Sequence, residues 1–306
     1  MKKLLILSAL CMCAVITGHA QGKFWNSKNA YLGQRPPGDK PEAFAREMIT
    51  KRDTFAFDRV AFSDDGTEFY YPSSNTWFNV GPAKIRYFKF SKGKWNGPFV
   101  LNEHYASPSF SSDGNKLYFT GGKPDKKHFI VWQSTRKPEG GWTEPSVYIA
   151  APYALYDFMT TNSGTCYAGS GVHADTSRHD MDICEYKMNP GDTTIRSLGE
   201  PINTKGFDGD FFVSRDESYM IVSTKETKTY ECELWITFHK PDGNWTPLAT
   251  LGPNINNGIA HRWGQYVTPD GKYLFYSTGH SPADCHIVWV RFDKLLAKLK
   301  KENLGS

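Results

Sequence analysis

One pattern of apolar and polar positions recurs five times along the chain. In its clearest copy, residues 267–278, a strand pattern leads into Asp270-Gly271 and then alternates large apolar with small polar residues. Asp-Gly favours a tight turn, because the central positions need positive φ, which glycine adopts freely and aspartate tolerates. Alternation with a period of two indicates half-buried β-strands. Each copy is therefore predicted to be a β-hairpin.

The five hairpins are followed by further strand patterns. A third strand with aromatic or aliphatic pairs comes next, as at residues 85–88 and 287–290, and in most copies a Gly/Asn-Trp turn and a fourth strand follow. The spacing of roughly 50 residues is typical of solenoids and propellers. The hairpin turns fall at Asp65, Asp113, Ser163, Asp216 and Asp270. Four antiparallel strands per unit, repeated radially, predict an all-β fold: a β-propeller with five four-stranded blades.

The ends of the chain complete this scheme. The last unit lacks a fourth strand, and residues 294–301 have the apolar spacing of a short amphipathic helix. A lone strand pattern at residues 43–50 precedes the first hairpin, just as each fourth strand precedes the next unit. We expect this N-terminal strand to complete the fifth blade and close the ring, because closure removes an open sheet edge.

The N-terminus has the pattern of a secretory signal peptide. Lys2 and Lys3 precede an apolar run, residues 4–17, which ends in Gly-His-Ala at 18–20. The run is short for a transmembrane helix. Cys11 and Cys13 follow large residues, so soluble export is favoured over lipidation. We expect a periplasmic or secreted protein without a membrane anchor after cleavage. The predicted organisation is a signal peptide (1–20), an extended arm (21–42), the propeller (43–293) and a C-terminal helix and tail (294–306).

Net charge limits the classes of partner, and the cysteine content limits the possible disulfides and metal sites. Loss of Lys2 and Lys3 lowers the formal charge from +4 to +2, which is too weak for a nucleic-acid or anionic-membrane partner. Four cysteines would remain, and their spacing matches no metal motif. Cys166 and Cys184 are expected on neighbouring strands of one hairpin, where they either form a disulfide or remain as buried thiols.

The hairpin consensus resembles a known repeat. Ser/Thr-x-Asp-Gly followed by an apolar-aromatic strand is similar to the WD40-like repeat of TolB-type periplasmic propellers. The leader Tyr-Leu-Gly-Gln-Arg-Pro-Pro-Gly at residues 31–38, the segment at 245–256 and the ending after residues 288–290 resemble a set of exported bacterial propellers. The resemblance implies the fold but no particular reaction. The third unit departs most, with Asn-Ser-Gly in its turn and an insertion at residues 169–180.

Candidate binding residues lie where each innermost strand is expected to begin, because these positions line one mouth of the central channel. Arg59 and Arg262 could clamp an acidic group. Trp263 and Tyr156 could stack on a sugar or peptide ring, and His261 could act as a general acid or base. The predicted ligand-binding set is Arg59, Tyr105, Tyr156, Asp157, Asp208, Asp210, His261, Arg262, Trp263 and Gln265.

Each of these features also has a structural interpretation. For Asp58, Asp157 and Asp208, hydrogen bonding between neighbouring blades is favoured. The loop around residues 169–182 has metal-ligand residue types without a fixed spacing, so a solvated loop is favoured and no metal site is predicted. Most tryptophans recur at fixed blade positions, which packing explains before carbohydrate binding does. The sequence contains no nucleophile elbow, zinc-binding helix motif or phosphate-binding glycine loop.

Two classes of function remain open. The leading one is a binding or protein-interaction module of the cell envelope, expected to be monomeric and without a cofactor, with an envelope protein or a glycan as ligand. The alternative is a carbohydrate-active enzyme, a polysaccharide lyase or glycoside hydrolase. In that case His261 is the acid/base, Arg262 and Arg59 neutralise a uronate, and Tyr156 or Tyr105 assists. A structural envelope protein is a third, weaker interpretation.

Overall fold

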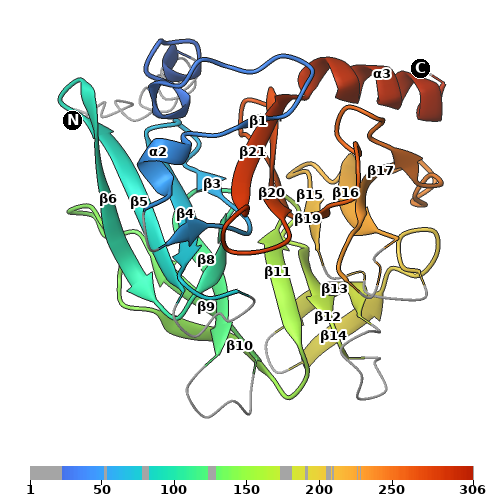
Figure 1. Ribbon diagram of the computed structural model, residues 1–306. Helices are drawn as coiled ribbons and strands as arrows, with labels where there is room; N and C mark the ends of the chain where they lie inside the picture. The colour runs from blue at the N-terminus through green and yellow to red at the C-terminus, as the bar shows by residue number, and fades with distance from the viewer. Residues whose placement is uncertain are drawn as a thin grey trace, which may run out of the picture.

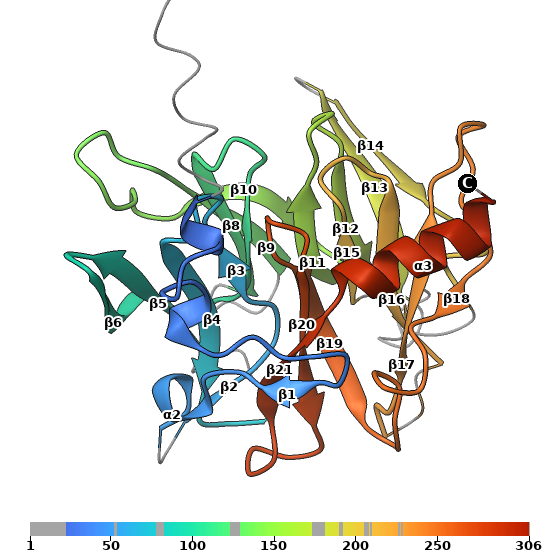
Figure 2. The ribbon, with the colours of Figure 1, turned by 90° about the horizontal axis from the view of Figure 1, so that it is seen from above.

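The computed structural model describes residues 23–51, 54–77, 83–122, 129–172, 181–189, 192–204, 208, 210–225, 227 and 229–305. These residues form five antiparallel sheets that follow one another around a ring (Figures 1 and 2). The chain is therefore a five-bladed β-propeller, as the sequence predicts. The signal-peptide pattern and residues 173–180 of the blade-three insertion lie outside the described residues, so the predictions made for them stay predictions.

Each blade has four strand positions, counted outwards from the centre. In blade one the innermost position is split between β2 and β3. The strands of blade one are β2 (Phe55–Ala56), β3 (Ala61–Phe62), β4 (Glu68–Ser74), β5 (Lys84–Ser91) and β6 (Lys94–Glu103). Those of blade two are β7 (Ala106–Phe110), β8 (Lys116–Gly122), β9 (Phe129–Thr135) and β10 (Ser146–Ala151). Those of blade three are β11 (Leu155–Thr160), β12 (Cys166–Ser170), β13 (Asp182–Asn189) and β14 (Asp192–Ser197).

Blades four and five complete the ring. Blade four contains β15 (Phe211–Val213), β16 (Tyr219–Thr224), β17 (Glu233–Phe238) and β18 (Ala249–Thr250). Blade five contains β19 (His261–Val267), β20 (Tyr273–Gly279) and β21 (His286–Arg291), with the N-terminal β1 (Glu42–Ala43) at its outer edge. Joining the two ends of the chain in one sheet leaves the ring without a gap at its start.

The repeated Ser/Thr-x-Asp-Gly sequence is a hydrogen-bonded turn. In blade one, Ser63 Oγ donates to Asp65 Oδ1 (2.6 Å) and accepts from the Glu68 N–H (2.9 Å), while Asp65 also accepts from the Thr67 N–H (3.0 Å). Blades two and five repeat the arrangement. Only the residue after the aspartate has positive φ, for example Gly66 at 75°. The aspartate is thus required as an acceptor, not for the left-handed conformation that Asp-Gly suggested.

Ring closure is confirmed, with a shorter strand than predicted. Ala43 pairs with Val288 of β21, and Phe44 is fully buried against the rings of Phe69 and Phe275. The strand stops at Ala43 because Ala45 is left-handed (φ 41°), and the predicted strand residues beyond it instead form the short helix α2 (Arg46–Ile49).

The N-terminal arm covers the junction between blades five and one. It is not wholly extended, because Tyr31–Gly33 form the 3-10 helix η1. Tyr31 Oη donates to Asp270 of blade five (2.5 Å), and Trp25 Nε1 donates to the Asp64 carbonyl of blade one (2.8 Å). The arm lies at the same end of the ring as the C-terminal helix α3 (Asp293–Leu304) (Figure 1). Among the described residues, no helix is long and apolar enough to cross a membrane.

Two structural interpretations of the sequence are confirmed. Trp142 of blade two packs between blades: its Nε1 donates to Tyr70 Oη of blade one (2.8 Å), and the Arg136 guanidinium lies over its ring. Cys166 and Cys184 are buried thiols. On the paired strands β12 and β13, Cys184 lies opposite Ala168, two positions from Cys166, so the ladder does not place the two sulfurs opposite each other.

Candidate functional site

The innermost strands bend where they pass the centre of the ring. At the same point in four blades one residue has positive φ: Asp58 (63°), Ser107 (51°), Asp157 (51°) and Gly264 (65°). In blades two, three and five the ladder register shifts at this residue, as in a β-bulge. A Cβ atom at Gly264 would lie 2.4 Å from the backbone nitrogen of Arg59. Glycine is therefore required at this position, because the main chain of blade one approaches it closely.

Arg59 occupies the centre of the ring. Its side chain is fully buried, and its guanidinium donates to the carbonyls of Phe158 (3.4 Å), Phe211 (2.5 Å) and Gln265 (3.4 Å), one each from blades three, four and five. Asp157 Oδ2 lies 3.2 Å from Arg59 Nη2 and neutralises its charge. Arg59 therefore ties four blades together and closes the channel between its two ends.

Asp58 is a second buried carboxyl beside this pair. It accepts a hydrogen bond from Ser107 Oγ of blade two (2.6 Å). Burial raises the pKa of Asp58 to about 6, and the nearby charge of Asp157 adds to the rise. Two carboxyl groups thus share the neighbourhood of one guanidinium. The inter-blade role that the sequence suggested for Asp58 and Asp157 is what their contacts show.

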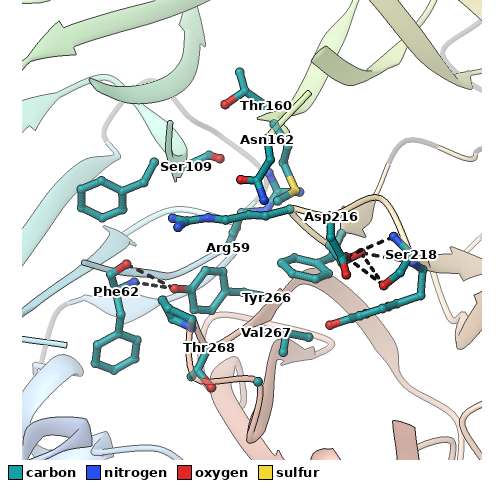
Figure 3. A pocket seen from close by; sticks show the side chains of 18 of the residues that line it. Arg59, Phe62, Ser109, Thr160, Asn162, Asp216, Ser218, Tyr266, Val267 and Thr268 are labelled. Atoms are coloured by element: carbon teal, nitrogen blue, oxygen red, sulfur yellow. Dashed lines mark hydrogen bonds between the residues drawn. The ribbon is translucent and has the colours of Figure 1, made fainter. Parts of the chain in front are cut away.

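A cavity of about 450 Å³ lies on one side of Arg59, at the end of the ring that carries the Asp-Gly turns. We call it the turn-side cavity. It is lined by residues from all five blades and by Leu296 and Lys300 of α3. Figure 3 shows Arg59 extending across the middle of this space, with Ser109, Thr160, Asn162 and Asp216 around it. The exposed residues Asn162 and Lys300 connect it to the surface.

Its walls combine aromatic and aliphatic side chains with polar and charged ones, among them Arg215, Asp216 and Lys300. Aromatic rings come from several blades, among them Phe62, Phe212 and Tyr266. The Tyr266 hydroxyl is held by the main chain of Phe62 (2.9 Å from the N–H). Thr160 Oγ1 is buried and has no hydrogen-bond partner among the described residues. Burial opposes ionisation of Asp216, but hydrogen bonds from Ser214 and Ser218 outweigh it and lower the pKa of this carboxyl.

The opposite end of the channel carries an aromatic group that we call the strand-start cluster: His261, Trp263, Trp77 and Tyr230. His261 and Trp263 stack with ring centroids 4.1 Å apart, and Trp77 meets Trp263 edge to face at 5.8 Å. Burial lowers the pKa of His261 to about 3, and His280 contributes to this shift. His261 is therefore a neutral ring at physiological pH.

Arg262 points away from this cluster. Its guanidinium makes five hydrogen bonds to main-chain carbonyls, those of Cys232, Ile255, Asn257, Gly258 and Ala260, and it also interacts with the Tyr276 hydroxyl. The side chain is 2% exposed. It holds the loop between blades four and five in place, and it lines a second cavity in that region.

The remaining predicted residues are dispersed. Tyr105 packs against Phe119 and Trp132 of its own blade, and Tyr156 lies 6.2 Å from the Phe129 ring. Asp208 accepts from the Thr204 N–H (2.6 Å), the Asp210 carbonyl accepts from the Ser223 N–H, and the Gln265 amide donates to Ser223 Oγ. Of the predicted set, only Arg59 lines the turn-side cavity. The described residues contain no group of three or more metal-ligand side chains.

Sequence reasoning missed most of the turn-side cavity because it selected the beginnings of the innermost strands. The cavity is lined by the ends of these strands and by the turns that follow, such as Met159, Thr160 and Thr268. The repeat itself contains a signal that could have located this cavity. Every Ser/Thr-x-Asp-Gly turn follows an innermost strand, so residues next to the turns converge at one end of the ring.

The comparisons with known proteins give similarities of fold only. No family model and no curated protein matches the chain. Among solved structures, TolB from Acinetobacter baumannii is 14% identical over 76% of this chain and 54% of that one, with a TM-score of 0.45. A structure from an analysis of two prolyl endopeptidases is 12% identical over 80% of this chain and 40% of that one (TM-score 0.46).

A puromycin-hydrolyzing peptidase from Mycobacterium tuberculosis is 12% identical over 81% of this chain and 38% of that one (TM-score 0.43). The chain thus spans about half of these proteins or less, and no function follows from similarity at this level. The fold and the site define the class of protein: a five-bladed β-propeller with a cavity on the turn side of the buried Arg59.

Proposed function

We propose that this chain is a binding and protein-interaction module of the cell envelope and that its partner engages the turn-side cavity. The observation that carries the proposal is the cavity itself, a hollow reached from the surface and built by residues from all five blades. Concave sites with apolar walls and a few polar groups are typical of ligand-binding sites. Export to the envelope rests on the signal-peptide pattern of residues 1–20 and on the resemblance to TolB-type propellers.

The chemistry of the strand-start residues supports binding rather than catalysis. The hydrogen bonds of Arg262 go to main-chain carbonyls, and a neutral His261 has little acid to offer at physiological pH. The carbohydrate-active alternative needs both residues in reactive roles. Neither residue is placed for such a role, so binding is favoured over catalysis.

The walls suggest how a partner would bind. Aromatic rings would surround an apolar side chain, and Thr160 Oγ1 would give or accept a hydrogen bond at its base. Lys300 stands exposed at the rim, where it would favour an acidic neighbour on the partner. We propose a segment of an envelope protein, presenting an apolar side chain flanked by an acidic one.

The test is site-specific photo-crosslinking in cells that produce the protein. A photoreactive residue replaces Asn162 at the turn-side rim or, as the matched control, Tyr230 on the opposite end. We expect a discrete adduct from position 162 but not from position 230, and its loss when Thr160→Trp fills the cavity. Thermal unfolding of each variant verifies that the fold persists. Adducts from position 230 alone, or adducts at 162 that survive Thr160→Trp, would contradict the proposal.

A further inference from the structure

Two guanidinium groups among the described residues are deeply buried, and they differ in their counter-ions. Arg59 is 0% exposed and has Asp157 at 3.2 Å. Arg262 is 2% exposed, and no ion pair to it occurs among the residues that the structure describes. Buried charges in proteins are normally paired, because a low-dielectric surrounding strongly disfavours an isolated ion. Carbonyl dipoles and the Tyr276 hydroxyl hold Arg262 in position, but no carboxylate of the described residues forms an ion pair with it.

Arg262 forms one wall of a cavity of about 440 Å³ that we call the seam cavity. The cavity lies between blade five, the loop that leads into it and the N-terminal arm. Its polar lining consists of Lys40, Asn254, Asn257, Arg262, Tyr276 and Thr278, and the other lining residues are prolines, Ala260 and Val288. None of these lining residues carries a carboxylate. Two cations, two amides and two hydroxyls therefore face one space.

One acidic side chain close enough to interact with Arg262, that of Glu233, is already engaged. The charge of Arg262 helps to lower the pKa of Glu233, but the Glu233 carboxylate contacts Lys225 Nζ (3.1 Å) and Trp235 Nε1 (2.7 Å). Glu233 does not line the seam cavity. Asp39 and Glu42 flank Lys40 and Pro41 in the sequence but do not line the cavity either, so the lining carries two positive charges and no carboxylate.

We propose that the seam cavity binds a small polyhydroxylated anion, a sugar that carries a carboxylate or a phosphate. Arg262 supplies the attracting charge without direct hydrogen bonds, because its donors are used by carbonyls. Lys40 and the amide of Asn257 would bond the anionic group, while Tyr276 and Thr278 offer hydroxyls that match those of a sugar. Low local dielectric strengthens the attraction of the buried charge. This site is separate from the turn-side cavity and independent of its role.

Isothermal titration calorimetry of the purified protein tests the proposal. The probes are galacturonate, glucuronate and glucose 6-phosphate, with galactose and glucose as neutral counterparts and inorganic phosphate and acetate as simple anions. We expect saturable binding of a sugar acid or a sugar phosphate that weakens as salt concentration rises. Lys40→Gln should weaken binding about tenfold, the usual size for a lost hydrogen bond to a charged group, and Thr278→Val should weaken it roughly threefold, because its hydroxyl meets a neutral sugar hydroxyl.

Lys94→Gln, on the edge strand of blade one, is the matched control and should leave binding unchanged. Arg262 is not substituted, because it holds five carbonyls and its loss would disturb the loop. Binding of uronates alone identifies a carboxylate ligand, and binding of glucose 6-phosphate alone identifies a phosphate ligand. The proposal is overturned if no probe saturates, if neutral sugars or simple anions bind equally well, or if Lys40→Gln and Thr278→Val bind like Lys94→Gln.

Discussion

The two ends of the central channel are built from the same strands and differ in character. At the turn-side end, the strands spread around a hollow with an unpartnered hydroxyl at Thr160. At the strand-start end, His261 and Trp263 stack tightly on each other. Arg59 separates the two. The difference teaches that residue type is a poor guide to a site in a propeller. The end where the sequence places histidine, arginine and tryptophan side by side is packed, and the open end is one that the sequence did not single out.

The largest expected effect comes from removing the plug that separates the two ends. Arg59→Met should lower the free energy of unfolding by about 3–5 kcal/mol, because Asp157 would be left buried without its counter-ion. Urea denaturation measures it. Arg291→Met breaks the exposed pair with Asp293 (2.8 Å) and is the matched control, for which we expect a much smaller loss because solvent screens exposed pairs. Equal losses in the two variants would show that Arg59 does not hold the ring together.

The next effect concerns pH. The folded pKa of Asp58, about 6, lies above that of an unfolded aspartate, so the folded state holds this proton more tightly. The contribution of Asp58 to the free energy of unfolding should therefore fall by on the order of 2–3 kcal/mol as pH rises from about 4 to 6. Above about pH 6 it should stay constant. Asp58→Asn keeps an acceptor for Ser107 and should remove this slope in urea denaturation between pH 4 and 7.

Asp113→Asn provides the control with the opposite sign. Hydrogen bonds from Ser111 and Asn115 lower the pKa of this exposed turn carboxyl, so its contribution is present at neutral pH and lost on acidification. If Asp58→Asn and wild type had the same pH slope, the carboxyl beside the plug would not be protonated in the folded protein at mildly acidic pH.

A smaller effect should distinguish the open end from a packed core. Thr160→Val removes a buried hydroxyl that has no partner and should stabilise the protein by up to about 1 kcal/mol while weakening partner capture in the crosslinking assay. Thr237→Val is the matched control, because Thr237 Oγ1 donates to the Thr246 carbonyl (2.7 Å). It should destabilise by about 1–2 kcal/mol. Loss of stability in both variants would indicate that Thr160 is a core hydroxyl and not a binding group.

The smallest effect is a titration. Since burial lowers the pKa of His261 to about 3, its ring signals should not titrate between pH 5 and 8 in a nitrogen-15 NMR experiment, whereas an ordinary histidine titrates near 6.5. His261→Phe identifies the signals. A midpoint near 6.5 would return His261 to the acid/base role that the sequence suggested.

Much of the fold could be predicted because its signals are local and repeated. A hairpin needs its own two strands and its turn, and Ser63, Asp65 and Gly66 form theirs within a few residues. Closure was predictable by counting strands. The site was not, because the contacts that decide it join residues far apart. Arg59 meets carbonyls 99, 152 and 206 residues away, and Arg262 turns its donors to a neighbouring loop.

Local sequence decided which segments form strands, where the hairpins turn and how many blades there are, because alternation and turn chemistry act over a few residues. Packing of the complete ring decided the rest. It buried Arg59 as a plug with Asp157 as its counter-ion. It also left Arg262 without an ion pair among the described residues and opened the hollow where the innermost strands end. Burial and charge compensation depend on all five blades at once, and no stretch of sequence contains that information.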